Sequence, residues 1–366
     1  MLRGGIVGLG NVARNGHLPA WRARSDVKIV AAADIASASR DAAVDVDPEF
    51  AIYDSAEALI AEECLDFVDV CTPPSAHGAV IRLALTRGLH VLCEKPLVLD
   101  RGELEELAEL ARRRDRVLAA VHNWRHAPAI RLASEILRSG RIGKVRRCVW
   151  EVLRDRPSAA APRPGVPNWR LDPVLSGGGI LVDHGWHAAY VLAGWMSEPL
   201  SRAGGRLETR KHRDSPVEDT ADLRLEFGQA RADVFLTWAA SERKNRVSID
   251  GSDGAIRIEG EALEIEARGT TERRELAGSL SDGSHHPEWF AGTAAEFLSE
   301  ISDRTLRGRS LEESAVCLEV IRLAQASSRL GGAMLAAGER ATALGEETAA
   351  AGTSASAGAA SEGRAR

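Results

Sequence analysis

Gly8-Leu9-Gly10-Asn11-Val12-Ala13 is the segment that decides the fold of this chain. An apolar run at residues 4–8 leads into it and helical spacing at residues 13–24 follows it, which predicts a strand, a glycine turn and a helix. The two glycines let the backbone turn sharply and let a pyrophosphate approach, while the small Ala13 lets the helix pack on the sheet. The helix N-terminus then faces the phosphates with its partial positive charge. We therefore predict a dinucleotide site whose first contacts are Gly8, Gly10, Asn11 and Val12.

Asp34 indicates which dinucleotide binds. It ends the second apolar run, residues 27–33, and follows Ala13 by 21 residues. An aspartate in this place accepts hydrogen bonds from both ribose hydroxyls and repels a 2′-phosphate, so NAD is favoured over NADP. Arg40 limits that preference. As alternatives, Asp34 could cap a helix, and the glycine motif alone could be a tight turn.

The alternation of strands and helices predicts the first domain. Apolar runs at residues 67–71, 90–93 and 117–121 alternate with helical segments, one of which opens with the capping-box pattern Asp100-x-x-Glu103. This alternation is typical of a parallel, doubly wound sheet. We predict an α/β fold that begins with a Rossmann domain over residues 1–122.

After residue 122 the pattern changes. The sequence predicts, in order, a helix at 128–138, a strand at 144–153, a proline-rich loop at 157–167 and a helix at 180–193. Residues 200–268 alternate apolar and polar side chains, as in an antiparallel sheet with one wet face. Two helices follow, the second opened by Ser310-x-x-Glu313.

The second domain is therefore predicted to be α+β, with an open, largely antiparallel sheet, over residues 123–335. We expect homodimers or homotetramers to form through this sheet, because its second face needs cover. Residues 336–366 are mostly Ala, Gly, Ser, Thr and Glu, and we expect a disordered tail.

Composition excludes several classes of partner. The formal charge of -6 comes from acids and arginines spread along the chain, so no basic stripe is present for a nucleic acid or an anionic membrane. The five cysteines are irregularly spaced, and we expect reduced core residues rather than disulfides. No signal-like N-terminus and no run of about 18 apolar residues occurs, so we expect a cytoplasmic protein with a small-molecule partner.

The segment Cys93-Glu94-Lys95-Pro96 predicts where the chemistry lies. Glu94 and Lys95 directly follow the apolar run His90-Val91-Leu92, and Lys95 is one of only five lysines beside 42 arginines. Burial and neighbouring charges can tune a lysine to transfer protons, which an arginine cannot do. The alternative is a surface ion pair at a strand end, followed by a turn proline.

A second group of functional side chains follows Gly177-Gly178-Gly179. On a helix, Asp183 and His187 are i and i+4, so the carboxylate can orient the imidazole and raise its basicity. Three glycines favour this interpretation, since they cost stability unless something approaches the backbone closely. The alternatives are an acidic helix terminus with a core histidine, or a metal site that adds His184, for which no fourth ligand occurs at suitable spacing.

Together these motifs resemble the glucose-fructose oxidoreductase / inositol dehydrogenase (Gfo/Idh/MocA) family. The matching motifs are the Gly8/Gly10/Ala13 turn, Cys71-Thr72-Pro73-Pro74-Ser75-x-His77, Glu94-Lys95-Pro96 and Gly-Gly-Gly-x-x-x-Asp183-x-x-x-His187. The resemblance covers about residues 3–332. In two places the chain departs from the family pattern: Tyr190 stands where an aspartate is frequent, and His184 stands where an apolar residue is common.

The resemblance implies a cofactor site, a catalytic pair and an oligomer. Thr72, Pro73, His77, Glu94 and Lys95 join the NAD site, and Lys95 and His187 meet at the nicotinamide together with Asp183. It also implies a cis Lys95-Pro96 bond and dimers or tetramers. The two departures leave the substrate open.

Oxidation of a secondary alcohol requires a base and a nearby hydride acceptor. We assign His187 as the base, Asp183 as its orienter and Lys95 as the cation that polarises the oxygen, although Lys95 and His187 could exchange roles. Further residues are placed to bound a polyol pocket together with His184: Trp124, Arg125, Trp169 and Arg170. The tryptophans could equally be core residues, and the arginines could lie on a solvated face.

The leading hypothesis is an NAD-dependent dehydrogenase that acts on a sugar, cyclitol or derivative. One alternative is a glycosidase that uses NAD for transient oxidation. Another is an NAD-binding sensor without catalysis, against which the intact Lys95, Asp183 and His187 argue.

Overall fold

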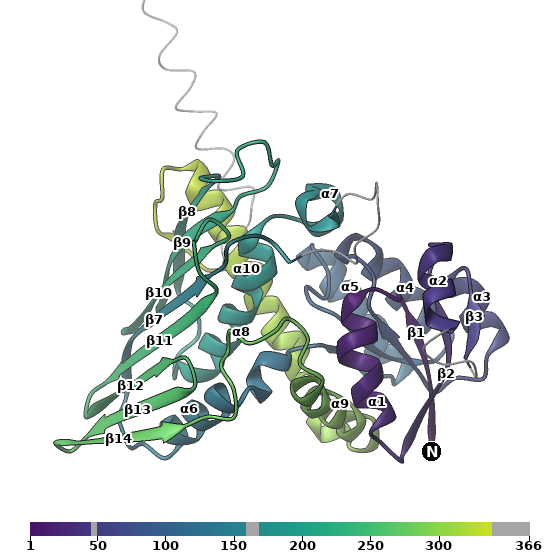
Figure 1. Cartoon of the computed structure of the whole chain (residues 1–366), viewed down its shortest axis with the longest axis horizontal. Helices are drawn as coiled ribbons and strands as arrows, with labels where there is room; N and C mark the ends of the chain where they lie inside the picture. The colour runs from purple at the N-terminus through teal and green to yellow at the C-terminus, as the bar shows by residue number, and fades with distance from the viewer. Residues whose placement is uncertain (45–49, 159–167, 339–366) are drawn as a thin grey trace, which may run out of the picture.

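The computed structural model describes residues 1–44, 50–158 and 168–338 (Figure 1). Two β-sheets lie at opposite ends of the molecule, with helices between them. The expected disordered tail lies outside the described residues from position 339 onward, as does most of the proline-rich loop.

The first sheet is parallel throughout and has the order β3-β2-β1-β4-β5-β6. Its strands are β1 (Leu2–Val7), β2 (Val27–Ala33), β3 (Ala51–Tyr53), β4 (Phe67–Val70), β5 (His90–Cys93) and β6 (Leu118–Ala120). This confirms the predicted doubly wound Rossmann sheet. Because all strands run the same way, the segments after β1, β2, β4 and β5 meet at one edge, where such sheets bind ligands.

The connecting helices include two that begin close to where the sequence predicts them, after the glycine turn and at Asp100. They are η1 (Ala13–His17) with α1 (Leu18–Arg22), α2 (Ser37–Val44), α3 (Ala56–Glu62), α4 (Pro74–Thr86) and α5 (Arg101–Arg114). The capping box at α5 is confirmed, since the Asp100 carboxylate accepts the Glu103 N–H at 3.0 Å. An unexpected feature is the π turn of η1, which interrupts the helix after the glycine turn.

The second sheet has the order β14-β13-β12-β11-β7-β10-β9-β8-β15. Its strands are β7 (Val145–Leu153), β8 (Arg202–Glu208), β9 (Thr220–Phe227), β10 (Ala230–Thr237), β11 (Lys244–Gly251), β12 (Gly254–Glu259), β13 (Ala262–Ala267), β14 (Thr270–Glu275) and β15 (Leu335–Ala336). All neighbours are antiparallel except β7 and β10, which confirms an open, largely antiparallel sheet.

One face of this sheet is covered and the other carries charges. The covering helices are α6 (Pro128–Arg138), α8 (Trp186–Trp195) and α10 (Arg309–Arg329), which lie between the two sheets (Figure 1). Trp150 of β7 is fully buried against Trp124 and Trp195. The opposite face bears ion pairs such as Arg147 with Asp233.

The C-terminal helices also pack on the first domain. Phe290 and Phe297 of α9 (Pro287–Ser302) join the core beneath the glycine turn, where they contact Trp21 and Phe67. The Ser310 hydroxyl accepts the N–H of Ala120 in β6. The predicted domain boundary at residue 122 separates the two sheets along the chain. The core of the Rossmann domain nevertheless includes α9, which comes much later in the sequence.

The described cysteines are free, as expected, but Cys64 is exposed rather than in the core. Cys64 precedes β4 in a connecting segment, where the side chain reaches the surface. Among the described residues, no helix is both long and apolar enough to cross a membrane.

The triglycine segment allows a close backbone approach. A Cβ on Gly179 would stand 1.9 Å from the Glu218 carbonyl oxygen. The Glu218 carboxylate accepts the N–H groups of Gly179 and Leu181, and burial raises its pKa. The glycines thus let the segment before β9 dock on the start of the helix that carries Asp183.

Gly179→Ala is expected to lower the free energy of unfolding by about 2 kcal/mol or more, because the new methyl group overlaps a backbone oxygen. Gly194→Ala in α8 is the matched control: no atom lies within 4 Å of its Cβ position, so we expect no loss. Urea unfolding measures both. Equal effects of the two substitutions would contradict the proposed close approach.

Candidate active site

Lys95 and Asp183 connect the two domains. Lys95 follows β5, and Asp183 lies in the π turn η4 (Leu181–Gly185) that leads into α8. Lys95 Nζ donates to the Asp183 carboxylate at 2.9 Å and to the Asp183 carbonyl oxygen at 2.7 Å. Both side chains are largely buried, and the Lys95-Pro96 bond is cis, as expected. The two motifs that the sequence singled out therefore meet directly.

Asp183 is held as a carboxylate. Burial favours its neutral form, but Lys95 and then His184 and Arg170 outweigh burial and place the pKa of Asp183 well below its usual value. His184 Nε2 lies 3.8 Å and Arg170 Nε 4.0 Å from its oxygens. A negative charge here holds Lys95 Nζ in position.

The expected pairing of Asp183 with His187 does not occur among the described contacts. Lys95 occupies the Asp183 carboxylate, and His187 Nδ1 instead lies 3.1 Å from the Tyr190 hydroxyl. The π turn explains the difference, because its i to i+5 bonding removes the alignment of residues four apart that an α-helix provides. Asp183 therefore orients Lys95 and not His187.

His187 is buried and neutral. Its ring stacks on Trp124 with centroids 4.6 Å apart. Burial, then Lys95 and His184, lower the pKa of His187 well below the usual value. Nε2 makes no hydrogen bond with the described part of the chain, which leaves it for a ligand.

A charged histidine lies behind Lys95. His17 Nε2 is 3.0 Å from Glu94 and Nδ1 is 2.9 Å from Asp69, and the Glu94 carboxylate also accepts the Lys95 N–H. Burial lowers the pKa of His17, but the Asp69 carboxylate outweighs it, so the pKa lies well above the usual value. An imidazolium thus locks the loop that carries Lys95. His17 and Asp69 were not expected from the sequence, since no local pattern marks a histidine in a helix as the partner of two acids at the ends of neighbouring strands.

His17, Asp69 and Cys71 are also the group with metal-ligand proximity in the described residues, with ligand atoms within 4.8 Å of one another. They are hydrogen-bonded to each other, and burial and Asp69 raise the pKa of the Cys71 thiol to about 12. A thiol that keeps its proton is a poor ligand. Asp183, His184 and His187 form no such group among the described residues.

The glycine turn fits a dinucleotide. Gly8 has φ +96°, and a Cβ there would meet the Cys71 backbone at 2.7 Å, whereas a Cβ on Gly10 would meet nothing within 4 Å. There is therefore room at Gly10 for a ligand that lies directly against the backbone. Asn11 and Val12 form the first turn of the helix that follows. The buried hydroxyl of Thr72, across from Gly8, has no partner among the described residues.

Asp34 is fixed by backbone donors. Its carboxylate accepts the N–H groups of Leu9 and Ala36, both at 2.8 Å, and so links β2 to the glycine turn. The Arg40 guanidinium donates to the carbonyl oxygens of Asp34 and Ile35 at 2.8 and 3.1 Å. Arg40 is thereby held beside Asp34.

Pro73 and His77 lie at the N-terminal end of α4. Pro73 precedes the first residue of α4. Both ring nitrogens of the buried His77 lie 2.8 Å from carbonyl oxygens, those of Thr72 and Pro96. His77 thus joins two loops, and its place in the cofactor site stays a prediction.

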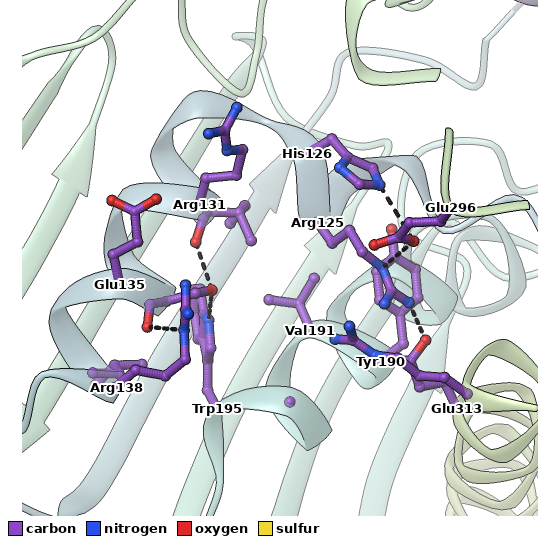
Figure 2. A pocket seen from close by; sticks show the side chains of 15 residues that line it. Arg125, His126, Arg131, Glu135, Arg138, Tyr190, Val191, Trp195, Glu296 and Glu313 are labelled. Carbon is purple, nitrogen blue, oxygen red and sulfur yellow. Dashed lines mark hydrogen bonds and ion pairs between the residues drawn. The ribbon is translucent and has the colours of Figure 1, made fainter. Parts of the chain in front are cut away.

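The expected pocket residues divide into two groups. Trp169, Arg170 and His184 gather at Asp183, with the Arg170 guanidinium 4.3 Å above the Trp169 ring. Arg125 instead forms ion pairs with Glu296 and Glu313 and lines a separate hollow of about 530 Å³ (Figure 2). Protein carboxylates therefore already neutralise Arg125.

Glu313 is a further residue that the sequence analysis misread. The expected capping box is wrong, because Gly308 precedes the helix and Ser310 lies inside it. Glu313 pairs with Arg125 and lies 2.8 Å from His122 Nδ1. A capping-box spacing cannot reveal partners this far away in sequence.

Both domains match models of one protein family. Residues 2–122 match the GFO_IDH_MocA model, described as an oxidoreductase family with an NAD-binding Rossmann fold, and residues 130–257 match the GFO/IDH/MocA C-terminal domain.

Two curated relatives and one solved structure illustrate the similarity. D-glucoside 3-dehydrogenase of Escherichia coli K12 is 31% identical over 52% of this chain, which spans about half (54%) of that protein. The dTDP-3,4-didehydro-2,6-dideoxy-alpha-D-glucose 3-reductase of Streptomyces antibioticus is 32% identical over 70% of this chain and 75% of that protein. An inositol dehydrogenase homolog from Azotobacter vinelandii, complexed with NAD+, shares the fold with a TM-score of 0.78 at 22% identity, over 92% of this chain and 97% of that one.

His17→Gln is expected to lower the free energy of unfolding by about 3 kcal/mol, since it leaves two buried acids without their cation. The pKa of His17 is raised on folding, so its stabilisation is complete below pH ~6.5 and is lost as the pH rises through the raised value. The penalty of the substitution should therefore shrink in alkaline solution, as followed by urea unfolding across pH.

His90→Gln is the control with opposite sign. Burial, then Arg116 and Arg307, lower the pKa of His90 to about 4, so its contribution is present above pH ~6.5 and is lost on acidification. A His17 penalty that is independent of pH would contradict the imidazolium assignment.

Proposed function

The chain belongs to the GFO/IDH/MocA oxidoreductase family, and on that premise we propose that it transfers hydride between NAD and a secondary alcohol of a sugar, cyclitol or sugar derivative. The observation that carries the proposal is the direct contact of Lys95 with Asp183 beside the dinucleotide edge of the first sheet. NAD supplies the hydride acceptor when it is bound at the glycine turn.

Lys95 and His187 are the proposed acid/base groups. The reaction needs a group that exchanges a proton with the substrate oxygen. Lys95 Nζ has three hydrogens and Asp183 accepts two, so one position can face a substrate. His187 Nε2 is likewise unengaged by described residues. Positioning by Asp183 restricts the lysine to one geometry, which is what proton transfer to a bound oxygen requires.

The polar groups around Asp183 support a polyol substrate. Arg170 Nε and His184 Nδ1 are buried and lack hydrogen-bond partners among the described residues. Buried polar groups seldom stay unpaired, and sugar hydroxyls can donate and accept. The names of the curated relatives, a glucoside dehydrogenase and a deoxysugar reductase, point to the same class.

Two alternatives remain for the catalytic outcome. A glycosidase that oxidises its substrate transiently would use the same Lys95 and His187 groups and release a sugar without net NADH. An NAD-binding sensor would use neither group. The buried Lys95–Asp183 pair argues against the sensor, because holding two charges away from water is costly without a task.

Oligomer formation and cytoplasmic location remain predictions. An interface on the exposed face of the second sheet would be polar, because that face carries Arg147–Asp233, Arg257–Asp250 and Arg246–Glu151 pairs. We expect a homodimer or homotetramer there.

Lys95→Ala is expected to lower kcat for NAD-linked oxidation by about 10²- to 10⁴-fold, since it removes a proton-transfer group. NADH formation across a panel of sugars and cyclitols measures it. Lys144→Ala, at an exposed lysine, is the control. Glycoside cleavage without net NADH would favour the glycosidase, and tight NAD binding without turnover would favour the sensor.

Asp34→Asn is expected to weaken NADH binding and to strengthen NADPH binding, each by roughly tenfold. The charge that accepts ribose hydrogen bonds and repels a 2′-phosphate is lost, while Asn retains an acceptor for the Leu9 N–H. Isothermal titration calorimetry with both cofactors tests this, with the exposed Asp54→Asn as control. An unchanged ratio of the two affinities would show that Asp34 does not select NAD.

A further inference from the structure

We infer that Tyr190 is a positioning residue that fixes the tautomer of His187, so that His187 donates a hydrogen bond to the substrate oxygen and Lys95 exchanges the proton. The inference rests on the proposed function and decides between the two roles that the sequence left exchangeable. It also assigns a role to Tyr190, one of the two residues at which the chain departs from the family pattern.

The donors around Tyr190 determine where its hydrogen points. The backbone N–H of Trp124 donates to the Tyr190 oxygen at 2.9 Å, and an N–H can only donate. The other polar neighbour of the hydroxyl among the described residues is His187 Nδ1, at 3.1 Å. The Tyr190 hydrogen is therefore donated to Nδ1, and neutral His187 carries its own hydrogen on Nε2.

The opposite tautomer is disfavoured. If Nδ1–H donated to Tyr190, the hydroxyl hydrogen would be buried without an acceptor in the described part of the chain, since Tyr190 is only 2% exposed. An unsatisfied buried donor of this kind shifts the equilibrium between the two His187 tautomers toward the Nε2–H form by a factor of about 5 to 150. Both groups stay neutral, because burial raises the pKa of the Tyr190 hydroxyl and lowers the pKa of His187.

The groups behind Tyr190 hold it in place. The His122 ring stacks on Tyr190 with centroids 4.1 Å apart, and the Arg125 guanidinium carbon lies 5.8 Å from the centroid of the Tyr190 ring. Figure 2 shows Tyr190 beside Arg125 and Glu313. These contacts restrict movement of the phenol ring, so its hydroxyl keeps the same neighbours.

The same hydrogen-bond reasoning assigns His122. Trp186 Nε1–H can only donate, and it lies 3.0 Å from His122 Nε2, so His122 carries its hydrogen on Nδ1 and donates to Glu313. Arg125 Nη2 also lies 3.4 Å from His122 Nδ1, and its own donation goes to Glu313. In the row from Glu313 to His187 the hydrogens of His122 and Tyr190 are assigned separately, because these two rings meet by stacking. At the end of this row, His187 presents Nε2–H.

This tautomer settles which group exchanges the proton. A protonated Nε2 has no lone pair, so it cannot act as a base and can only donate to the substrate oxygen. In oxidation the carbon loses a hydride to the bound nicotinamide, and the hydroxyl proton passes to the amine form of Lys95. The products are a ketone and a Lys95 ammonium, which returns the proton to solvent; reduction uses the same atoms in reverse.

Nitrogen NMR of histidine-labelled protein reads the tautomer directly, with His187→Gln to assign the signals. Because neither cofactor nor substrate is needed, the result is independent of whether the proposed activity is found. We expect Nε2 to be protonated and Nδ1 to be unprotonated in the wild type. Protonated Nδ1 with bare Nε2 would overturn the inference.

Substitutions at position 190 test the cause. Tyr190→Phe should let the Nδ1–H form appear, and Tyr190→Asp should make it dominant, since a carboxylate only accepts. The matched control is Tyr53→Phe at the other tyrosine of the chain, whose hydroxyl donates to Glu63. This substitution should leave the His187 tautomer unchanged. If Tyr190→Phe leaves the tautomer unchanged while near-ultraviolet circular dichroism shows native packing, the inference fails.

Kinetics supply a second readout. Glutamine at position 187 can donate a hydrogen bond but cannot accept a proton, so His187→Gln should lose only about tenfold in kcat. Loss of a true base costs about 10²- to 10⁴-fold. A loss for His187→Gln as large as that for Lys95→Ala would contradict the assigned roles.

Discussion

The ion pair between Lys95 and Asp183 is the interaction on which the rest of the site depends. It joins a loop of the parallel sheet to the helix that begins the buried layer of the second domain. Both charges are largely removed from water, so each is costly without the other. Together with the packing of α9 on the Rossmann core, this pair fixes how the dinucleotide edge of the first sheet meets the helix that carries Asp183.

Two rows of contacting side chains lie near this pair. One is charged and runs from Asp69 through the His17 imidazolium to Glu94, next to Lys95. The other runs from Glu313 through His122, with stacked Tyr190 leading to neutral His187. The first row holds a cation in place, and the second holds a donor. Such fixed protonation states suit a reaction in which one oxygen gains and loses a proton.

The sequence was sufficient for features that local patterns encode. The glycine turn, the alternation of strands and helices and the capping box at Asp100 were predicted from such patterns, whereas the cis bond at Lys95-Pro96 was implied by the family resemblance. It failed where long-range contacts or helix irregularities decide. The π turn at Asp183 removed the expected i to i+4 pairing with His187. The Ser310-x-x-Glu313 spacing predicted a capping box, whereas Glu313 contacts His122. The return of α9 to the Rossmann core is likewise set by packing of Phe290 and Phe297, which no periodicity assigns to one domain.

A crystal structure of the protein with NADH and a sugar that it turns over would test the central claim most directly. The account predicts that one substrate oxygen lies within hydrogen-bonding distance of both Lys95 Nζ and His187 Nε2, while Lys95 keeps its contact with Asp183. A substrate oxygen held elsewhere, with Lys95 bound only to protein groups, would contradict it.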